Sequence, residues 1–142
     1  MQEKTIETLN EIEALLKQSG QRFTAPRRHV MGTLLDHGQA AKAYDIVEMM
    51  GDVKPMTVYR ALDFLSAQGL VHRIESLNAY APCVEHHCAH KDSQYLICEK
   101  CESVTELHNH AIDHKIDEEL AKAGFSPRLK TIEVHGVCEK CS

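Results

Sequence analysis

The sequence lacks the features that would place it in a membrane or in a secretory pathway. It contains no run of about 18 apolar residues, the length that a membrane-spanning helix needs. Its first five residues, Met1 to Thr5, lack the basic and then apolar pattern of a signal peptide. From these absences we expect a cytoplasmic protein without a membrane partner.

Motifs of common catalytic chemistry are missing as well. There is no H-E-x-x-H, no G-x-S-x-G and no glycine-rich phosphate loop. Pro82 and Cys83 are followed by Val-Glu-His, which does not match the P-C-x-x-C of zinc deaminases. The sequence therefore predicts that the protein is not an enzyme and has no small-molecule substrate.

A surplus of positive charge is also absent, since the formal net charge is −5. Residues 1–80 carry nine basic and ten acidic side chains, and residues 81–142 carry seven and eleven. Without the acidic first helix, residues 17–80 hold eight basic and six acidic side chains, a net of +2. This weak positive footprint does not by itself indicate a nucleic-acid partner.

The first half of the chain follows helical periodicity. Apolar residues three and four apart predict four helices, over residues 5–19, from residue 24, over 43–50 and over 55–68. In the first of them, Ile6, Leu9, Ile12, Leu15 and Leu16 share one side, and Thr24 is the expected N-cap of the second.

A hairpin is expected directly after the fourth helix. Residues 70–75 and 79–82 have strand character, with a turn at Asn78. Helices followed by a hairpin give the order of a winged helix, whose last helix enters the major groove of DNA. The outer face of that helix would carry Thr57, Tyr59, Arg60 and Asp63. The helix order fits any other small helical domain equally well, with Arg60 as a solvated surface charge.

The second half mixes strands and one helix. Residues 95–97, 103–107 and 129–137 read as strands, and residues 110–123 as a helix with Ile112, Ile116, Leu120 and Ala123 facing inward. The expected fold class is α+β, with a domain over residues 1–82, a polar connection over 83–94 and a small α/β domain over 95–142.

Six cysteines include two C-x-x-C pairs, Cys98 with Cys101 and Cys138 with Cys141. Each pair forms a tight knuckle that offers two thiolates, and two knuckles complete a closed tetrahedral shell, which is typical of structural zinc. One such pair alone could serve redox chemistry. The two together predict a four-cysteine zinc site.

Further candidate metal ligands gather before the first of these pairs and between the two. Eight of the ten histidines lie beyond residue 70, beside Cys83 and Cys88. Singly, each of these is explained as a surface histidine or a small buried cysteine. Their concentration predicts a second, mixed cysteine and histidine site that acts as a switch when metal fills it.

Several segments then give the chain a resemblance to a known family. Thr57 to Leu62, preceded by Pro55 and followed by Gly69 to His72, resembles the recognition-helix motif of the Fur family of metalloregulators. Arg22 to Arg27 resembles the start of that family's second helix, and the two C-x-x-C pairs match its structural zinc site. The segments Ala43 to Asp45 and Glu75 to Cys83 are similar to its zinc uptake regulator branch.

The resemblance implies a winged helix-turn-helix DNA-binding domain followed by a dimerisation domain, with two zinc ions per subunit. It implies structural zinc on Cys98, Cys101, Cys138 and Cys141, and regulatory zinc on His72, Cys83, His90 and Glu106. His86, His87 or Cys88 could replace His90, while His108, His110 and His114 could form a further site. The family's other site has a late histidine where Lys130 stands here. A soft cysteine ligand in the sensor favours zinc over iron.

The same resemblance implies a homodimer that binds double-stranded operator DNA and represses zinc uptake genes. Arg60 would read bases, because a guanidinium grips a guanine edge with two hydrogen bonds. The other DNA-binding residues would be Thr57, Tyr59, Tyr44, Arg22, Arg27 and Arg28. The alternatives are a family member that senses iron or peroxide, and a zinc-ribbon adaptor that binds protein.

Overall fold

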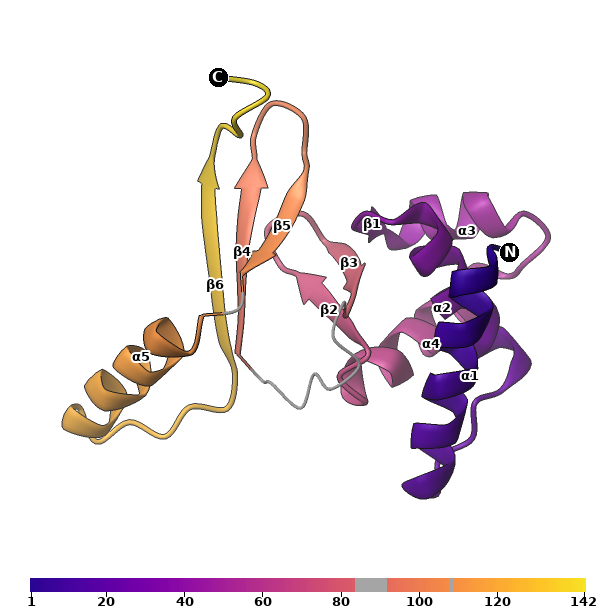
Figure 1. Ribbon diagram of the computed structural model, residues 1–142, viewed down its shortest axis with the longest axis horizontal. Coiled ribbons are helices and arrows are strands. Elements are labelled where there is room, and N and C mark those ends of the chain that lie inside the picture. Colours follow the sequence, from indigo (N-terminus) through magenta and orange to yellow (C-terminus); the bar gives the residue numbers. More distant parts are fainter. Residues whose placement is uncertain (84–91, 108) are drawn as a thin grey trace. The chain divides into compact units, whose positions relative to one another are not determined.

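The computed structural model describes residues 1–83, 92–107 and 109–142, with the side chains of Asp92 and Ser93 left aside. Its contacts divide the chain into two compact units, Met1–Cys88 and Ala89–Ser142 (Figure 1). None of the helices in the described ranges is long and apolar enough to cross a bilayer. The expected domain limits at residues 82 and 95 stay a prediction.

The first unit is built on four helices, as the periodicity predicts. They are α1 (Glu3–Gln18), α2 (Ala25–His37), α3 (Ala43–Met50) and α4 (Pro55–Ala67). Proline stands in the first turn of α2 and of α4, where its missing N–H costs no hydrogen bond. Thr24 occupies the N-cap position of α2, but its side chain makes no capping hydrogen bond.

The helical core of this unit is continuous from α1 to the first strand after α4. Its fully buried members include Leu9, Ile12, Leu34, Ile46 and Leu62. The buried apolar stripe predicted for α1 is too wide, because two of its residues, Ile6 and Leu15, are exposed. A helix that packs against a neighbour on one side leaves its other side exposed, and α1 packs against α2.

A small sheet follows α4 and forms the wing. Strands β2 (Val71–Ile74) and β3 (Ala79–Pro82) pair antiparallel, and a two-residue strand β1 (Ala41–Lys42) adds to the other side of β3. Asn78 takes a positive φ of 49° in the turn, and Arg73 donates a 2.8 Å hydrogen bond to the Asn78 Oδ1. The hairpin confirms the expectation, whereas β1 was not expected.

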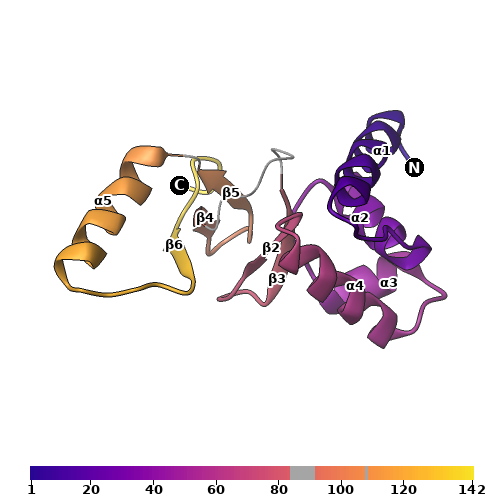
Figure 2. The same ribbon diagram turned by 90° about the horizontal axis from the view of Figure 1, so that it is seen from below.

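The second unit contains a three-stranded sheet in the order β5-β4-β6. The strands are β4 (Asp92–Cys98), β5 (Val104–Leu107) and β6 (Lys130–Gly136). Strand β4 pairs antiparallel with β5 and parallel with β6 (Figures 1 and 2). In the parallel register, Cys98 lies opposite Gly136. The parallel pairing brings the carboxyl ends of β4 and β6 to the same edge of the sheet.

Helix α5 (His110–Lys122) connects β5 to β6 and is held by polar contacts. The Gln94 amide donates to the Asp113 Oδ1 at 2.6 Å, and the Lys130 ammonium pairs with Asp117. The Asn109 side chain caps the helix by accepting from the Ala111 N–H. No residue of α5 is buried, so the prediction that Ile112, Ile116, Leu120 and Ala123 form a buried face is wrong for this chain taken alone.

Candidate metal centre and nucleic-acid interface

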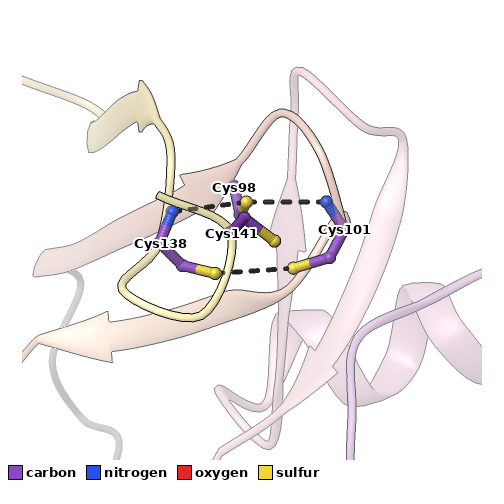
Figure 3. A group of neighbouring side chains, drawn as sticks. All are labelled: Cys98, Cys101, Cys138 and Cys141. Carbon is purple, nitrogen blue, oxygen red and sulfur yellow. Dashed lines mark hydrogen bonds between the residues drawn. The ribbon is translucent and has the colours of Figure 1, made fainter.

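The four predicted cysteines converge at one edge of the second sheet (Figure 3). Cys98 ends β4 and Cys101 closes the turn that follows it, while Cys138 and Cys141 belong to the turn after β6. Glu102, at a φ of 59°, donates its N–H to the Cys98 carbonyl at 2.9 Å and completes the first turn. The Cys141 N–H donates to the Cys138 carbonyl at 3.0 Å in the second turn.

The spacing of the four sulfurs fits a zinc ion. All four Sγ atoms lie within 4.8 Å of one another, and those of Cys101 and Cys138 are 3.8 Å apart. Tetrahedral zinc with Zn–S bonds of about 2.3 Å holds its sulfurs about 3.8 Å apart. All four thiols are free, and four thiolates leave no open position for a substrate, as in a structural site.

Backbone donors prepare one sulfur for this role more than the others. The N–H groups of Cys101 and Cys138 point at the Cys98 sulfur, at 3.5 and 3.4 Å, and lower the pKa of Cys98 to about 6. A hydrogen bond with the Ser103 hydroxyl lowers the pKa of Cys101. Hydrogen bonds with the Cys138 and Cys101 thiols raise the pKa of Cys141 to about 12.

The residues expected to hold regulatory zinc are distributed over several segments. His72 lies on β2 and is half-buried, and Cys83 follows β3 with 3% of its surface exposed. The Cys83 N–H donates to the Leu70 carbonyl at 3.0 Å, which extends the β2–β3 pairing. Since Leu70 and His72 share a face of the hairpin, Cys83 lies on that face too.

Of the other two residues expected to hold regulatory zinc, Glu106 and His90, only Glu106 lies among the described residues. Glu106 lies on β5 and is half-buried. His90 lies outside the described residues, as do His86, His87, Cys88 and His108. Cys83 is disulfide-bonded in this structure, so its sulfur becomes a zinc ligand only after reduction.

Helix α4 carries two opposite stripes. Val58, Ala61, Leu62 and Leu65 are buried against the core. Tyr59, Arg60 and Asp63 are exposed, as expected, whereas Thr57 is half-buried at the margin of this face. Met56 is exposed too, and sequence reasoning missed it, although its spacing of three, four and seven residues from Tyr59, Arg60 and Asp63 contained the signal.

The other expected DNA-binding residues lie on α2, on α3 and just before α2 in the first unit. The Arg27 guanidinium lies over the Phe64 ring of α4, 3.5 Å from its centroid, and donates to the Arg22 carbonyl at 2.6 Å. Arg28 donates to Asn10 and Glu13 of α1, at 2.9 and 3.3 Å. Tyr44 is exposed on α3, and a hydrogen bond with the Glu48 carboxylate raises the pKa of its hydroxyl.

Comparison with known proteins adds a consistent set of relatives. The model of the ferric uptake regulator family matches residues 18–141. The zinc uptake regulation protein of Escherichia coli (strain K12) is 36% identical over 141 residues, which cover 96% of this chain and 82% of that protein. Its counterpart in Mycobacterium tuberculosis (strain H37Rv) is 32% identical, over 89% of this chain and 98% of that one.

Among solved structures, a zinc uptake regulator complexed with zinc and DNA is similar over the whole fold. The TM-score is 0.91 at 35% identity, and the match covers 99% of this chain and 96% of that chain. A ferric uptake regulation protein of Neisseria meningitidis (strain MC58) is 28% identical over 96% of both chains.

Proposed function

The chain belongs to the ferric uptake regulator family, in its zinc uptake regulator branch, and on that premise we propose that it is a zinc-responsive repressor. As a zinc-loaded dimer in the cytoplasm it would bind operator DNA and repress zinc uptake genes. One observation carries the proposal: a single chain exposes Arg60 on the recognition helix of a winged helix and assembles a four-cysteine metal site.

Two zinc ions per subunit would have different tasks. Cys98, Cys101, Cys138 and Cys141 would hold the first, which supplies four metal–sulfur bonds that join the ends of β4 and β6. His72, Cys83, His90 and Glu106 would hold the second. His72 lies on β2 and Cys83 directly follows β3, so both belong to the wing hairpin and move with the DNA-binding unit.

The wing is a suitable place for a sensor because it continues directly from the recognition helix. The Leu70 N–H donates to the Leu65 carbonyl at 2.9 Å, so the start of the hairpin is bound to the last turn of α4. Fixing His72 and Cys83 therefore limits the motion of α4. A ligand that favours one arrangement of a mobile element shifts its population, and zinc would favour the arrangement that fits DNA.

DNA contacts would be divided between bases and backbone. Arg60 would read a guanine edge from the exposed face of α4. Tyr59 and Tyr44 would contact backbone or thymine methyl groups, and Arg22, Arg27 and Arg28 would meet phosphates. Thr57 would belong to the same DNA-binding surface. The contacts of Arg27 with Phe64 and of Arg28 with Glu13 and Asn10 order these two guanidinium groups in advance, which lowers the entropy cost of binding.

The second unit has a surface that suits pairing with another copy. Leu96 of β4 lies opposite Val134 of β6, and Leu107 of β5 lies on the same face of the sheet. All three are exposed, and Ile112 of α5 is exposed as well. Apolar side chains gathered on one face mark interaction surfaces, and a homodimer would bury them.

Operator binding in zinc-buffered solution tests the proposal. Binding is measured at fixed salt and with a reductant, while free zinc is raised and then replaced by ferrous or manganous ion. We expect zinc alone to promote binding, and Cys83→Ser to abolish this response in a folded dimer. Operator binding that does not depend on zinc would contradict the proposal, and operator binding restored best by ferrous ion would identify an iron sensor.

Arg60→Ala tests the DNA-reading role directly. Loss of a base-reading pair costs about 1–3 kcal/mol, so we expect operator preference to fall about tenfold or more while zinc binding and dimerisation persist. Arg128→Ala, which removes an exposed arginine of the second unit, is the matched control. Unchanged preference in Arg60→Ala would support a protein-binding adaptor instead.

A further inference from the structure

We propose that Met56 contacts a thymine methyl group in the operator and so contributes to sequence specificity. The inference rests on the proposed function, because it assigns a base contact to the recognition helix. It concerns a residue that neither the expected DNA contacts nor the two metal sites include. Met56 stands in the first turn of α4, directly after Pro55.

The position of Met56 on α4 places it with the base-reading residues. Residues three, four and seven positions apart lie on one face of a helix, and Met56 has this spacing to Tyr59, Arg60 and Asp63. The buried stripe from Val58 to Leu65 has the same spacing two residues later, on the opposite face. Met56 has 58% of its surface exposed, more than the 41% of Tyr59.

The chemistry of the methionine side chain limits what it can recognise. A thioether offers no donor and only a weak acceptor, so it does not read the polar edges of guanine, cytosine or adenine. Thymine alone presents an apolar group, its C5-methyl, in the major groove. The unbranched and polarisable Met side chain adapts to such a surface, and the N-terminal residues of a recognition helix are those that contact base edges.

Thr57, the neighbouring residue that is also expected among the DNA-binding residues, is less well placed for this contact. Its side chain is half-buried, and its N–H donates to the Lys54 carbonyl at 3.0 Å in the first turn. One position along a helix rotates a side chain by about 100°, which moves Thr57 away from the Tyr59 and Arg60 face. Met56 therefore takes the base-facing position at this end of α4.

An exposed methionine is common on any protein surface, and the chain offers a matched control for this explanation. Met49 of α3 has 42% of its surface exposed and no place on the outer face of α4. If exposure alone mattered, Met49 and Met56 would behave alike when DNA binds. The contact with thymine requires that they differ.

The experiment uses the full-length zinc-loaded dimer and a duplex that this protein selects from a random-sequence pool. Each thymine of the duplex is replaced in turn by deoxyuridine, which removes only the C5-methyl. Since burying one methyl contributes about 0.8 kcal/mol, the wild type should lose about three- to fivefold in affinity at one thymine of each half-site. Met56→Ala should lose that sensitivity, while Met56→Leu and Met49→Ala should retain it.

The outcomes separate the inference from the proposed function. A wild type that selects a sequence, and whose deoxyuridine profile is the same in Met56→Ala, overturns the thymine contact and leaves the repressor assignment intact. A wild type that selects no sequence overturns both. Loss of sensitivity in Met56→Ala and Met49→Ala alike also overturns the contact, because the effect would then be unspecific.

Discussion

At the scale of single residues, the four cysteines differ although their sequence motifs are the same. Backbone N–H groups of Cys101 and Cys138 stabilise the thiolate of Cys98, whose pKa falls to about 6. The Cys141 thiol lies among other thiols, and its pKa rises to about 12. At neutral pH, Cys98 is therefore ionised before metal arrives, whereas Cys141 must release a proton to become a ligand.

This difference predicts the pH dependence of zinc binding at the four-cysteine site. As pH falls from 8 to 6.5, protons compete for Cys141, and the apparent affinity should fall about tenfold per pH unit for each proton released. Cys98 adds to this dependence only near and below pH 6, its pKa being about 6. Competition with a chelator of known pH response measures the slope, in Cys83→Ser to silence the second site. An affinity independent of pH would contradict the thiol assignment.

At the scale of elements, hydrophobic periodicity predicted the helices well but missed a strand that is too short to show any periodicity. Helices α1 to α5 begin close to their predicted starts, and α1, α3, α4 and α5 also end close to their predicted ends, because each repeats apolar side chains over two turns or more. Strand β1 has two residues, too few for any pattern. The prediction of a buried face on α5 was wrong, because the apolar residues of α5 have no buried partner within one chain.

The candidate site divides in the same way. The four cysteines were predictable because each knuckle is local, although their meeting depends on the parallel pairing of β4 with β6. Met56 was missed because an apolar residue between proline and threonine carries no chemical signal of its own. The contact of Arg27 with Phe64 joins α2 to α4, and no local sequence pattern predicts a contact between residues so far apart in the chain.

That contact predicts a coupling between α2 and α4. In a double-mutant cycle of Arg27→Met and Phe64→Leu, we expect a coupling of about 0.5–1 kcal/mol in the free energy of unfolding, as for exposed cation–π pairs. Denaturant titration of the full chain supplies the four values. Arg28→Met with Phe64→Leu is the control, because Arg28 binds Glu13 and Asn10 instead. Equal coupling energies in the two cycles would contradict a stabilising contact between Arg27 and the Phe64 ring.

At the scale of the whole molecule, the two units depend on metal to different degrees. The first contains a continuous core from α1 to Val71. In the described part of the second, the buried apolar residues are Tyr95, Ile97 and Cys98, and they lie on one strand. A small core is commonly supplemented by structural metal, so the second unit should lose its structure first when zinc is removed.

Hydrogen exchange during chelation tests this unequal dependence. After zinc removal under reducing conditions, we expect amides of β4 to β6 to lose protection while those of α2 and α4 keep it. Cys138→Ser should reproduce this pattern and yield monomers, since it removes one of the four sulfurs. Uniform loss of protection over both units would show that they unfold together, and a folded dimer of Cys138→Ser would contradict the structural site.

The parallel pairing of β4 with β6 also has a kinetic consequence. Asp92 pairs with Lys130 although β5 and α5 lie between them in the sequence, so the pairing is non-local and adds to the contact order of the chain. Non-local parallel pairing slows folding, because the entropy of loop closure is lost before the strands gain their hydrogen bonds. A zinc ion that binds first to one C-x-x-C pair and then to the other joins the two ends of this loop before β4 and β6 pair. Zinc should therefore set the refolding rate of the second unit as well as its stability.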